Sequence, residues 1–343
     1  MTRITRVLSS LAAASAVLLL GGCTAGAFDT TSAEEPADGL TLQENYQQVV
    51  EKVLPSVVEI TTAEGLGSGI VYDDAGHIVT NAHVVGSAKT FQVTPAVGGD
   101  TLDATLVASY PAEDIAVIQV QGSLPGSPAT FADSTQLKVG QIVLAMGNPL
   151  GLSGSVSQGI VSAVGRTETE RRTADSPGAT LADMIQTTAA INPGNSGGAL
   201  ADLAGNVVGI PTLAATSSQD GGAAPGIGFA ISASTATRIA DQLIANGKVV
   251  DSDRAALGVT VRGVIDSQSR ALGVGVVAVT AGGPSAAAGM QPGDIITAID
   301  GTPIPTVTEL NVFLASKKPG DQVTVTITRA DSSMDVPVTL GEL

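Results

Sequence analysis

Cysteine is almost absent from the sequence, with Cys23 the only one among 343 residues. A disulfide within the chain is therefore excluded, and no cysteine-rich metal site can form. Histidine is also scarce, since the chain has only two. We expect no metal site and no cofactor.

Aromatic residues make up only 2% of the sequence, and tryptophan is missing. The hydrophobic residues, 43% of the total, are mostly Val, Ala, Ile and Leu. Together with 41 glycines and many threonines, this composition favours β-structure with many turns. The length is sufficient for about two domains.

The chain has few basic residues. Lys and Arg number 16 against 32 Asp and Glu, which gives a formal net charge of −16. Nucleic acid is excluded as a partner, because phosphate binding requires a basic surface. The same sign gives no electrostatic attraction to anionic lipids. We interpret the acidity as serving solubility.

The N-terminus has the pattern of an export signal. Arg3 and Arg6 precede an apolar run over residues 7–20, which is short for a membrane-spanning helix. The run ends in Leu20-Gly21-Gly22-Cys23, which resembles a bacterial lipobox. We expect a lipoprotein signal peptide over residues 1–22 and lipid attachment at Cys23, which would hold the chain at the extracytoplasmic face of the cell membrane. The alternative is an ordinary signal peptide or an uncleaved anchor.

The rest of the chain divides into a tether and two β-rich units. Residues 23–41 are small, polar and acidic, and we expect a flexible tether. From Ser56 onward, short β-branched runs alternate with turn signals, as at residues 57–60 and 207–210, which indicates a barrel or sandwich. We expect one domain over residues 42–247, a linker over 248–254 and a second domain over 255–343.

One helix is expected at the end of the first domain. Ser232 or Ser234 can cap its start, and Asn246-Gly247 ends it. Its apolar residues recur at helical spacing on one face: Ala236, Ile239, Ala240, Leu243 and Ile244.

Three residues form a candidate catalytic set. His83 follows a predicted strand, Asp114 begins another, and Ser196 lies in the glycine-rich segment 192–198. Their order along the chain is that of a chymotrypsin-like double barrel. A serine hydroxyl needs a base within hydrogen-bond reach, histidine can take that proton near neutral pH, and a buried carboxylate fixes the imidazole tautomer. The turn at Gly194, Asn195 and Ser196 is the predicted oxyanion hole.

Four segments that carry these residues resemble the HtrA (DegP-like) serine proteases: residues 80–85, 114–120, 147–151 and 185–200. The resemblance extends from about Tyr46 to the C-terminus. It implies a mostly β fold, with a chymotrypsin-like double β-barrel followed by an α+β PDZ domain. It further implies an ATP-independent serine endopeptidase for quality control of unfolded or mislocalised extracytoplasmic proteins, and a homotrimer.

The resemblance also implies how the site is regulated. Loops at residues 165–181 and 213–225 would order on activation. The specificity pocket would favour small aliphatic residues and would be lined by Ile191, Gly226, Ile227, Gly228 and Phe229. The sequence departs from the family pattern at Thr188, where an aspartate is common. The missing carboxylate would affect the order of the loops near the active site, and not the catalytic residues themselves.

The second domain resembles a PDZ domain at several motifs. Residues 256–259 resemble the loop that holds a peptide's terminal carboxylate, with Leu257, Gly258 and Val259 as binding residues. Residues 283–290 and 292–296 match the PDZ pattern, and residues 309–316 suit the helix beside the peptide groove. We therefore expect peptide C-termini as ligands.

Two alternatives stay open at this point. The first is a PDZ-bearing adaptor or chaperone whose protease fold binds polypeptides and rarely cuts them, and the second is a solute-binding lipoprotein. The intact set of His83, Asp114 and Ser196 argues against the first, and the lack of an alternating α/β pattern disfavours the second. The remaining histidine, His77, lies within a predicted strand, and we interpret it as a surface or packing residue.

Overall fold

The computed structural model describes residues 37–343, apart from residues 64, 123–126, 149–153, 170–179, 193, 217–222, 266–267 and 269. The predicted signal peptide, Cys23 and most of the predicted tether lie outside the described residues. The chain divides into two compact units, Met1–Thr41 and Leu42–Leu343. No helix in the described part of the chain is both long enough and apolar enough to span a membrane.

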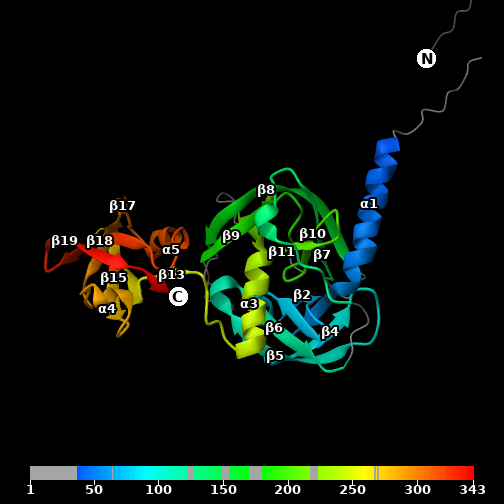
Figure 1. Cartoon of the computed structure of the whole chain (residues 1–343), viewed down its shortest axis with the longest axis horizontal. Coiled ribbons are helices and arrows are strands. Elements are labelled where there is room, and N and C mark those ends of the chain that lie inside the picture. The colour runs from blue at the N-terminus through cyan, green and yellow to red at the C-terminus, as the bar shows by residue number, and fades with distance from the viewer. Residues whose placement is uncertain are drawn as a thin grey trace, which may run out of the picture. The chain divides into compact units, whose positions relative to one another are not determined.

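The second unit opens with the rest of helix α1 (Ala37–Val53), which begins before the start of folded sequence expected at Leu42 (Figure 1). Val49 and Val53 are buried in the largest hydrophobic cluster of the protein. Lys52 Nζ donates a hydrogen bond to Ala204 O at 2.7 Å. These contacts hold the C-terminal half of the helix against the fold.

Two closed antiparallel barrels follow, each of six strands (Figure 1). In the first barrel the order is β1-β2-β3-β6-β5-β4. Its strands are β1 (Val57–Thr61), β2 (Leu66–Val71), β3 (His77–Thr80), β4 (Thr90–Pro95), β5 (Leu102–Tyr110) and β6 (Ile115–Val120). In the second the order is β10-β11-β12-β9-β8-β7. Its strands are β7 (Ile142–Gly147), β8 (Ser155–Thr169), β9 (Thr180–Thr187), β10 (Ala199–Asp202), β11 (Val207–Thr216) and β12 (Ala223–Ser232).

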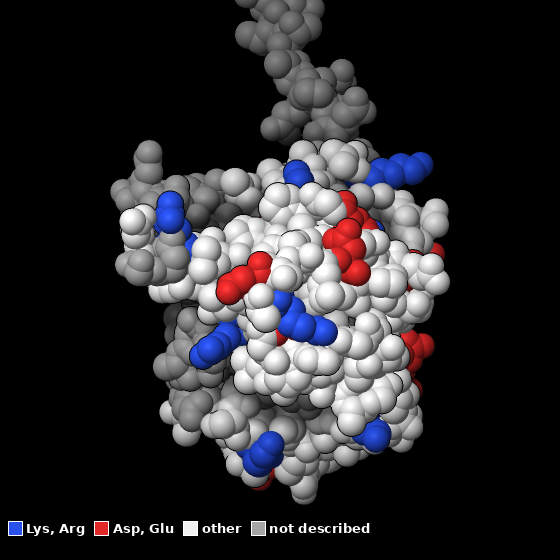
Figure 2. All heavy atoms as spheres, turned by 90° about the vertical axis from the view of Figure 1, so that its left-hand side faces the viewer, with Lys and Arg blue, Asp and Glu red and all other residues white. Residues whose placement is uncertain are grey.

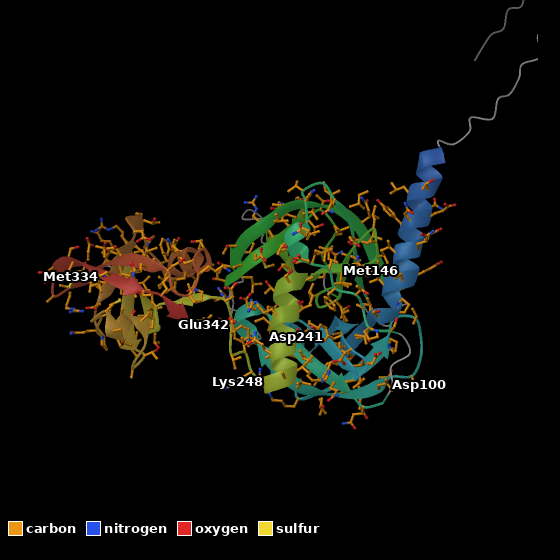
Figure 3. The ribbon with its side chains drawn as sticks, in the orientation of Figure 1. Asp100, Met146, Asp241, Lys248, Met334 and Glu342 are labelled. Carbon is orange, nitrogen blue, oxygen red and sulfur yellow. The ribbon has the colours of Figure 1, made fainter. Side chains whose placement is uncertain are left out.

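Short β-branched strands close well into barrels because alternate side chains fill the interior. Ile60, Ile78 and Ile118 are fully buried in the first barrel, while Met146 is fully buried on β7 of the second, where Figure 3 labels it. Closure leaves no unpaired sheet edge. The predicted mostly β protease fold is therefore confirmed.

Helix α3 (Ala233–Asn246) runs across both barrels (Figure 1). Ser232 caps it by accepting from Thr235 N, and Gly247 ends it in the left-handed conformation with φ 67°. Both ends were predicted from the sequence. On its solvent side, Asp241 accepts a hydrogen bond from the Tyr72 hydroxyl at 2.5 Å, which connects α3 to the end of β2 (Figure 3).

The C-terminal domain has its own core, built around Val274, Ile296 and Ile327. Its main sheet has the order β14-β15-β16-β18-β19, with β17 paired to β16, and β13 pairs with β20. Its strands are β13 (Ala255–Ala256), β14 (Val259–Ile265), β15 (Ala271–Val279), β16 (Ile295–Ile299), β17 (Thr302–Pro303), β18 (Gln322–Arg329), β19 (Ser332–Thr339) and β20 (Gly341–Glu342). Helices α4 (Pro284–Ala287) and α5 (Val307–Ala315) complete the predicted PDZ fold.

The two loops expected at residues 165–181 and 213–225 are shorter than the sequence indicated. Strand β8 continues to Thr169, β9 begins at Thr180, β11 continues to Thr216, and β12 begins at Ala223. The middle parts of both loops lie outside the described residues. The difference arises because antiparallel pairing, such as Thr169 with Thr180, extends the strands into segments whose small and charged residues had indicated loops.

The face shown in Figure 2 is largely uncharged. Its Lys and Arg side chains stand in separate places, with Asp and Glu side chains between them. The positive charge on this face is therefore distributed and not gathered into one patch.

Candidate active site

His83 and Asp114 meet on the first barrel. His83 lies on the short helix α2 (Ala82–Val85), and Asp114 follows the 3-10 turn η2 (Pro111–Glu113). His83 Nδ1 lies 2.9 Å from Asp114 Oδ2, and the His83 backbone N–H donates to Asp114 Oδ1 at 2.9 Å. The aspartate is 2% exposed, whereas the His83 side chain is 26% exposed. A buried carboxylate thus orients a solvent-accessible imidazole.

The backbone at Asp114 has an uncommon conformation, with φ 52° and ψ 39°. A non-glycine residue in the left-handed region costs free energy, so neighbouring contacts must hold it. Ala82 N and Asn81 Nδ2 each donate to Asp114 O at 3.1 Å. The helix that carries His83 therefore also fixes the aspartate backbone.

Thr212 on β11 connects this pair to Ser196. Its hydroxyl donates to Asp114 Oδ2 at 2.5 Å, and its carbonyl oxygen accepts from Ser196 Oγ at 3.4 Å. Thr212 is 5% exposed. The structure therefore brings His83, Asp114 and Ser196 together at the junction of the two barrels. Sequence reasoning missed Thr212, because its place depends on the register of β11 and no local motif marks it.

The loop that carries Ser196 is held tightly against the first barrel. Ser68 N donates to Ser196 O at 2.8 Å, and the Ser68 hydroxyl donates to Gly194 O at 2.5 Å. Gly197 has φ +82°, and a Cβ there would lie 2.2 Å from Ser68 O. Only glycine fits this close approach. Ser68 is a second residue that sequence reasoning missed.

The donors for an oxyanion differ from the predicted set at one position. Asn195 N donates to Asn192 O at 3.1 Å, so it is used inside the turn. Among the described residues, the backbone N–H groups of Gly194 and Ser196 have no acceptor. Two such N–H groups, one on the nucleophile itself and one two residues before it, can stabilise a tetrahedral oxyanion.

The Asn195 side chain completes the loop from within. Its amide nitrogen donates to Ala190 O at 3.0 Å, and its amide oxygen accepts from Asn192 N at 3.1 Å. The residue is 6% exposed, so these bonds satisfy a buried polar group. The neutral side chain of Asn195 therefore holds the loop in its shape by bonding to two other residues of the same loop.

The predicted pocket residues do not all share one face. Ile191 lies directly over Gly228, since a Cβ on Gly228 would be 2.3 Å from Ile191 Cγ1. Phe229 points the other way, into the barrel core, because side chains alternate along a strand. Gly226 has φ +76°, and Ile227 is 39% exposed. Of the predicted pocket residues, Ile191 and Gly228 therefore lie against each other.

Thr188 provides an acceptor at the position where the sequence departs from the family pattern. Its hydroxyl accepts from Ile160 N at 2.9 Å, and Thr188 N donates to Ile160 O at 3.1 Å. A hydroxyl thus joins this segment to β8 without a carboxylate.

His77 is placed apart from this constellation. His77 Nδ1 lies 2.7 Å from Asp73 Oδ2 within the turn between β2 and β3. Desolvation opposes ionisation of Asp73, but hydrogen bonds from His77 and Ala75 keep the pKa of that carboxyl below its usual range. The pair stabilises the hairpin, which is a structural role.

The predicted peptide loop of the second domain contains one backbone position that requires glycine. Gly258 has φ +67°, and a Cβ there would lie 3.0 Å from Pro284 Cδ. Leu257 is 2% exposed and belongs to the domain core, whereas Val259 is only partly buried. Of the two apolar neighbours that we predicted for a ligand side chain, only Val259 is accessible. In the described part of the chain, no group of three or more His, Cys, Asp or Glu could hold a metal ion.

Comparison with known proteins agrees with this geometry. Residues 67–210 match the trypsin-like peptidase domain, and residues 255–340 match the PDZ domain. The chain is 41% identical over 320 residues to the serine protease PepD of Mycobacterium tuberculosis, a match that covers 87% of this chain and 66% of PepD. It is 36% identical over 287 residues to the serine protease Do-like HtrA of Lactobacillus helveticus, with 80% and 68% covered. The chain belongs to the HtrA family.

Solved HtrA structures share the fold. The HtrA-type protease AlgW with a decapeptide aligns with a TM-score of 0.58 at 30% identity and covers 87% of this chain and 98% of AlgW. This chain is therefore a member of a family of trypsin-like serine endopeptidases with a C-terminal PDZ domain. It spans about two thirds of the length of these two curated relatives, at 66% of PepD and 68% of the Lactobacillus helveticus protein.

Proposed function

We propose that this HtrA chain is a serine endopeptidase with Ser196 as nucleophile, His83 as general base and Asp114 as the carboxylate that orients His83. The observation that carries the proposal is the chain of hydrogen bonds from His83 through Asp114 and Thr212 to Ser196. The Thr188 hydroxyl accepts a hydrogen bond from Ile160 N at the position where the family commonly has an aspartate. The missing aspartate therefore gives no support to the alternative of an adaptor or chaperone that binds polypeptides without cutting them.

The reaction follows from these groups. Ser196 Oγ attacks the scissile carbonyl carbon while His83 takes the hydroxyl proton, and Asp114 stabilises the imidazolium that forms. The Gly194 and Ser196 N–H groups bind the oxyanion. His83 then gives its proton to the leaving amine, and the C–N bond breaks to leave an acyl-enzyme. Water, deprotonated by His83, hydrolyses that ester and regenerates Ser196. No step consumes ATP.

The substrates that we propose are unfolded or mislocalised extracytoplasmic polypeptides, cut after small aliphatic residues. Ile191 over Gly228 supports the preference, because the isoleucine fills space that a long side chain would need. A protease for unfolded chains needs an extended segment, which a folded protein does not offer. The homotrimer rests on the family resemblance.

We also propose that the PDZ domain regulates cleavage by binding peptide C-termini. The loop at Leu257, Gly258 and Val259 supports this, because its left-handed glycine allows close approach of a carboxylate to the backbone. The AlgW structure holds a decapeptide, which concerns that relative. The domain bounds that we propose are 42–247 for the protease, 248–254 for the linker and 255–343 for the PDZ domain.

Replacement of Gly258 by valine should abolish the effect of peptides ending in Val, Ala or Phe on cleavage of an unrelated reporter. A Cβ at φ +67° is strained and presses on Pro284. If the PDZ domain activates, these peptides raise wild-type cleavage, and if it only tethers, they slow degradation of tagged substrates. Gly320→Val is the matched control, since it has φ +90° in open space. An unchanged peptide response in Gly258→Val would contradict regulation through this loop.

Replacement of Cys23 by serine should release the protein from membranes or stall its processing. The Leu20-Gly21-Gly22-Cys23 motif supports lipid attachment at this single thiol, which would place the protease at the extracytoplasmic face of the membrane. Fractionation of cells that express each form measures the effect. Equal membrane retention and equal processing would point to an uncleaved signal anchor.

A further inference from the structure

The linker between the two domains is fixed to the protease domain along its length. Gln242 on α3 accepts from Val250 N and Asp251 N at 2.8 Å each, and its amide donates to Asp251 O at 2.7 Å. Arg238, one turn earlier, donates to the same carbonyl at 3.0 Å. The backbone at Val250 and Asp251 is therefore attached to α3, although the sequence there is polar and short.

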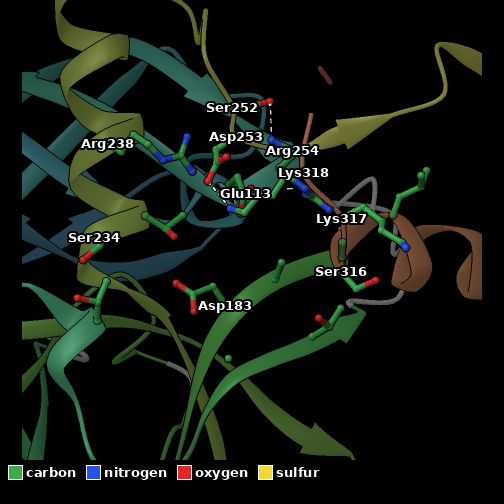
Figure 4. Close-up of a pocket in the computed structure, with 17 residues that line it drawn as sticks. Glu113, Asp183, Ser234, Arg238, Ser252, Asp253, Arg254, Ser316, Lys317 and Lys318 are labelled. Atoms are coloured by element: carbon green, nitrogen blue, oxygen red, sulfur yellow. Dashed lines mark hydrogen bonds and ion pairs between the residues drawn. The ribbon is translucent and has the colours of Figure 1, made fainter. Parts of the chain in front are cut away.

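Arg254, at the end of the linker, contacts the turn that precedes Asp114. Its guanidinium donates to Ala112 O at 2.8 Å, and its Nε lies 3.5 Å from Glu113 Oε1. The side chains of Arg254 and Glu113 are only 13% and 4% exposed. Figure 4 shows Arg254, Glu113 and Arg238 together in the pocket beside this turn. Both acceptors belong to η2, whose last residue is bonded directly to Asp114.

We propose that Arg254 is a positioning residue of the protease, which holds the turn Pro111–Glu113, and with it Asp114, from the interdomain linker. Asp114 has a left-handed backbone that depends on its neighbours, and its N–H donates to Pro111 O at 3.2 Å. Arg254 contacts the same turn at Ala112 and at Glu113, the residue before Asp114. The inference rests on the proposed role of Asp114 in orienting His83.

Arg254 is also bonded to the residue that follows the last strand of the PDZ domain. Leu343 N donates to Arg254 O at 2.9 Å, and the Glu342 carboxylate, labelled in Figure 3, accepts from the Ser252 backbone and hydroxyl. Strand β13, which follows Arg254 directly, pairs with β20 and leads into the loop at Gly258. If the loop at Gly258 moved, residues 255–257 would transmit the movement to Arg254. The Arg254 guanidinium would then transmit it to the turn before Asp114.

The ionisation of Glu113 makes its contact with Arg254 depend on pH. Burial raises the pKa of Glu113 to about 7, while Arg254 and Arg238 act in the opposite direction and Asp183 and Asp253 add to the rise. Tyr110, at the end of β5, also faces Glu113. Above this pKa the carboxylate forms an ion pair with Arg254. Below it the carboxyl is neutral, and the hydrogen bond to Ala112 O is what remains.

The test compares kcat and KM for a short peptide substrate, and the rate at which an organophosphonate modifies Ser196, in the full-length protein. Arg254→Gln should lower kcat and the modification rate by roughly ten- to a hundredfold with little change in KM, because misplacing a catalytic group by an ångström costs about that much. Arg254→Lys should recover part of the loss. The low-field proton resonance of the His83–Asp114 hydrogen bond should broaden or shift in Arg254→Gln.

Glu113→Gln mimics the protonated carboxyl. Its kcat should equal that of the wild type near pH ~5.5, where Glu113 is neutral, and fall several-fold below it near pH ~8.5, where the wild type has the ion pair. If the kcat of Glu113→Gln equalled that of the wild type at both pH values, Glu113 would have no part in positioning Asp114.

Arg329→Gln is the matched control. Arg329 pairs with the buried Asp294 and donates to Gly289 O at 3.0 Å, the same arrangement within the PDZ domain and away from η2. It should lower thermal stability without changing kcat. Unchanged kcat and modification rate in Arg254→Gln, or an equal fall in Arg329→Gln, would overturn the inference. An inactive wild type would instead contradict the proposed function.

Discussion

Ser196→Ala should lower peptide-bond hydrolysis by a factor on the order of 10⁶ in kcat, because the acyl-enzyme can no longer form. Within the described part of the chain, the hydroxyl makes one hydrogen bond, a long one of 3.4 Å to Thr212 O, and the side chain is partly exposed. Little packing is therefore lost, and the variant should fold normally. Digestion of casein, with circular dichroism and thermal unfolding on the same sample, measures both statements.

Ser134→Ala is the matched control for this substitution. Ser134 is 8% exposed and bonds to Ser234, with no bond to His83, Asp114 or Ser196. Its removal should cost stability and leave kcat unchanged. Normal cleavage by a folded Ser196→Ala variant would show that another residue is the nucleophile.

Asp114→Asn should lower kcat by about 10⁴-fold while substrate binding changes little, as in serine proteases whose triad aspartate is replaced by asparagine. The carboxylate accepts three bonds at its two oxygens, from His83 N, His83 Nδ1 and the Thr212 hydroxyl. An amide has one oxygen and one NH₂ group, so one of these donors must face another donor. The imidazole then adopts the wrong tautomer for a general base.

Thr212→Val separates the roles of the neighbouring groups in this prediction. It removes one donor to Asp114 and keeps the carboxylate, so its loss in kcat should be much smaller than that of Asp114→Asn. Comparison of kcat for the two variants, with KM for a peptide substrate as the check on binding, measures this difference. A fall in kcat of less than about tenfold in Asp114→Asn would show that this carboxylate does not orient the base.

The sequence alone was sufficient to predict the elements and residues that a local motif marks. The segments around His83, Asp114 and Ser196 predicted the double barrel, and the serine and glycine at its ends predicted α3. It was insufficient where a role depends on strand register, as for Thr212, Ser68 and Arg254. Each of these approaches its partner across more than 90 residues of chain, with 98 between Thr212 and Asp114, 126 between Ser68 and Gly194, and 142 between Arg254 and Ala112. No periodicity or spacing reports such contacts.

The same limit explains the smaller differences. Asn195 could be placed in the oxyanion turn from sequence, but the direction of its N–H follows from the turn type, which brings it to Asn192 O. Leu257 was expected beside the peptide ligand because it is apolar, and it is buried because the PDZ core lies on its side of the loop.

The closure of the Ser196 loop by Asn195 has a consequence for when activity arises. A neutral amide bonded to Ala190 and Asn192 requires no ammonium group from elsewhere in the chain. The loop therefore takes its shape as the barrel folds, whether the N-terminus is cleaved, extended or acylated. The shape of this loop therefore does not depend on a cut in the chain. Restraint of the proposed protease would then depend on which polypeptides reach Ser196 and on how firmly the surrounding turns are held.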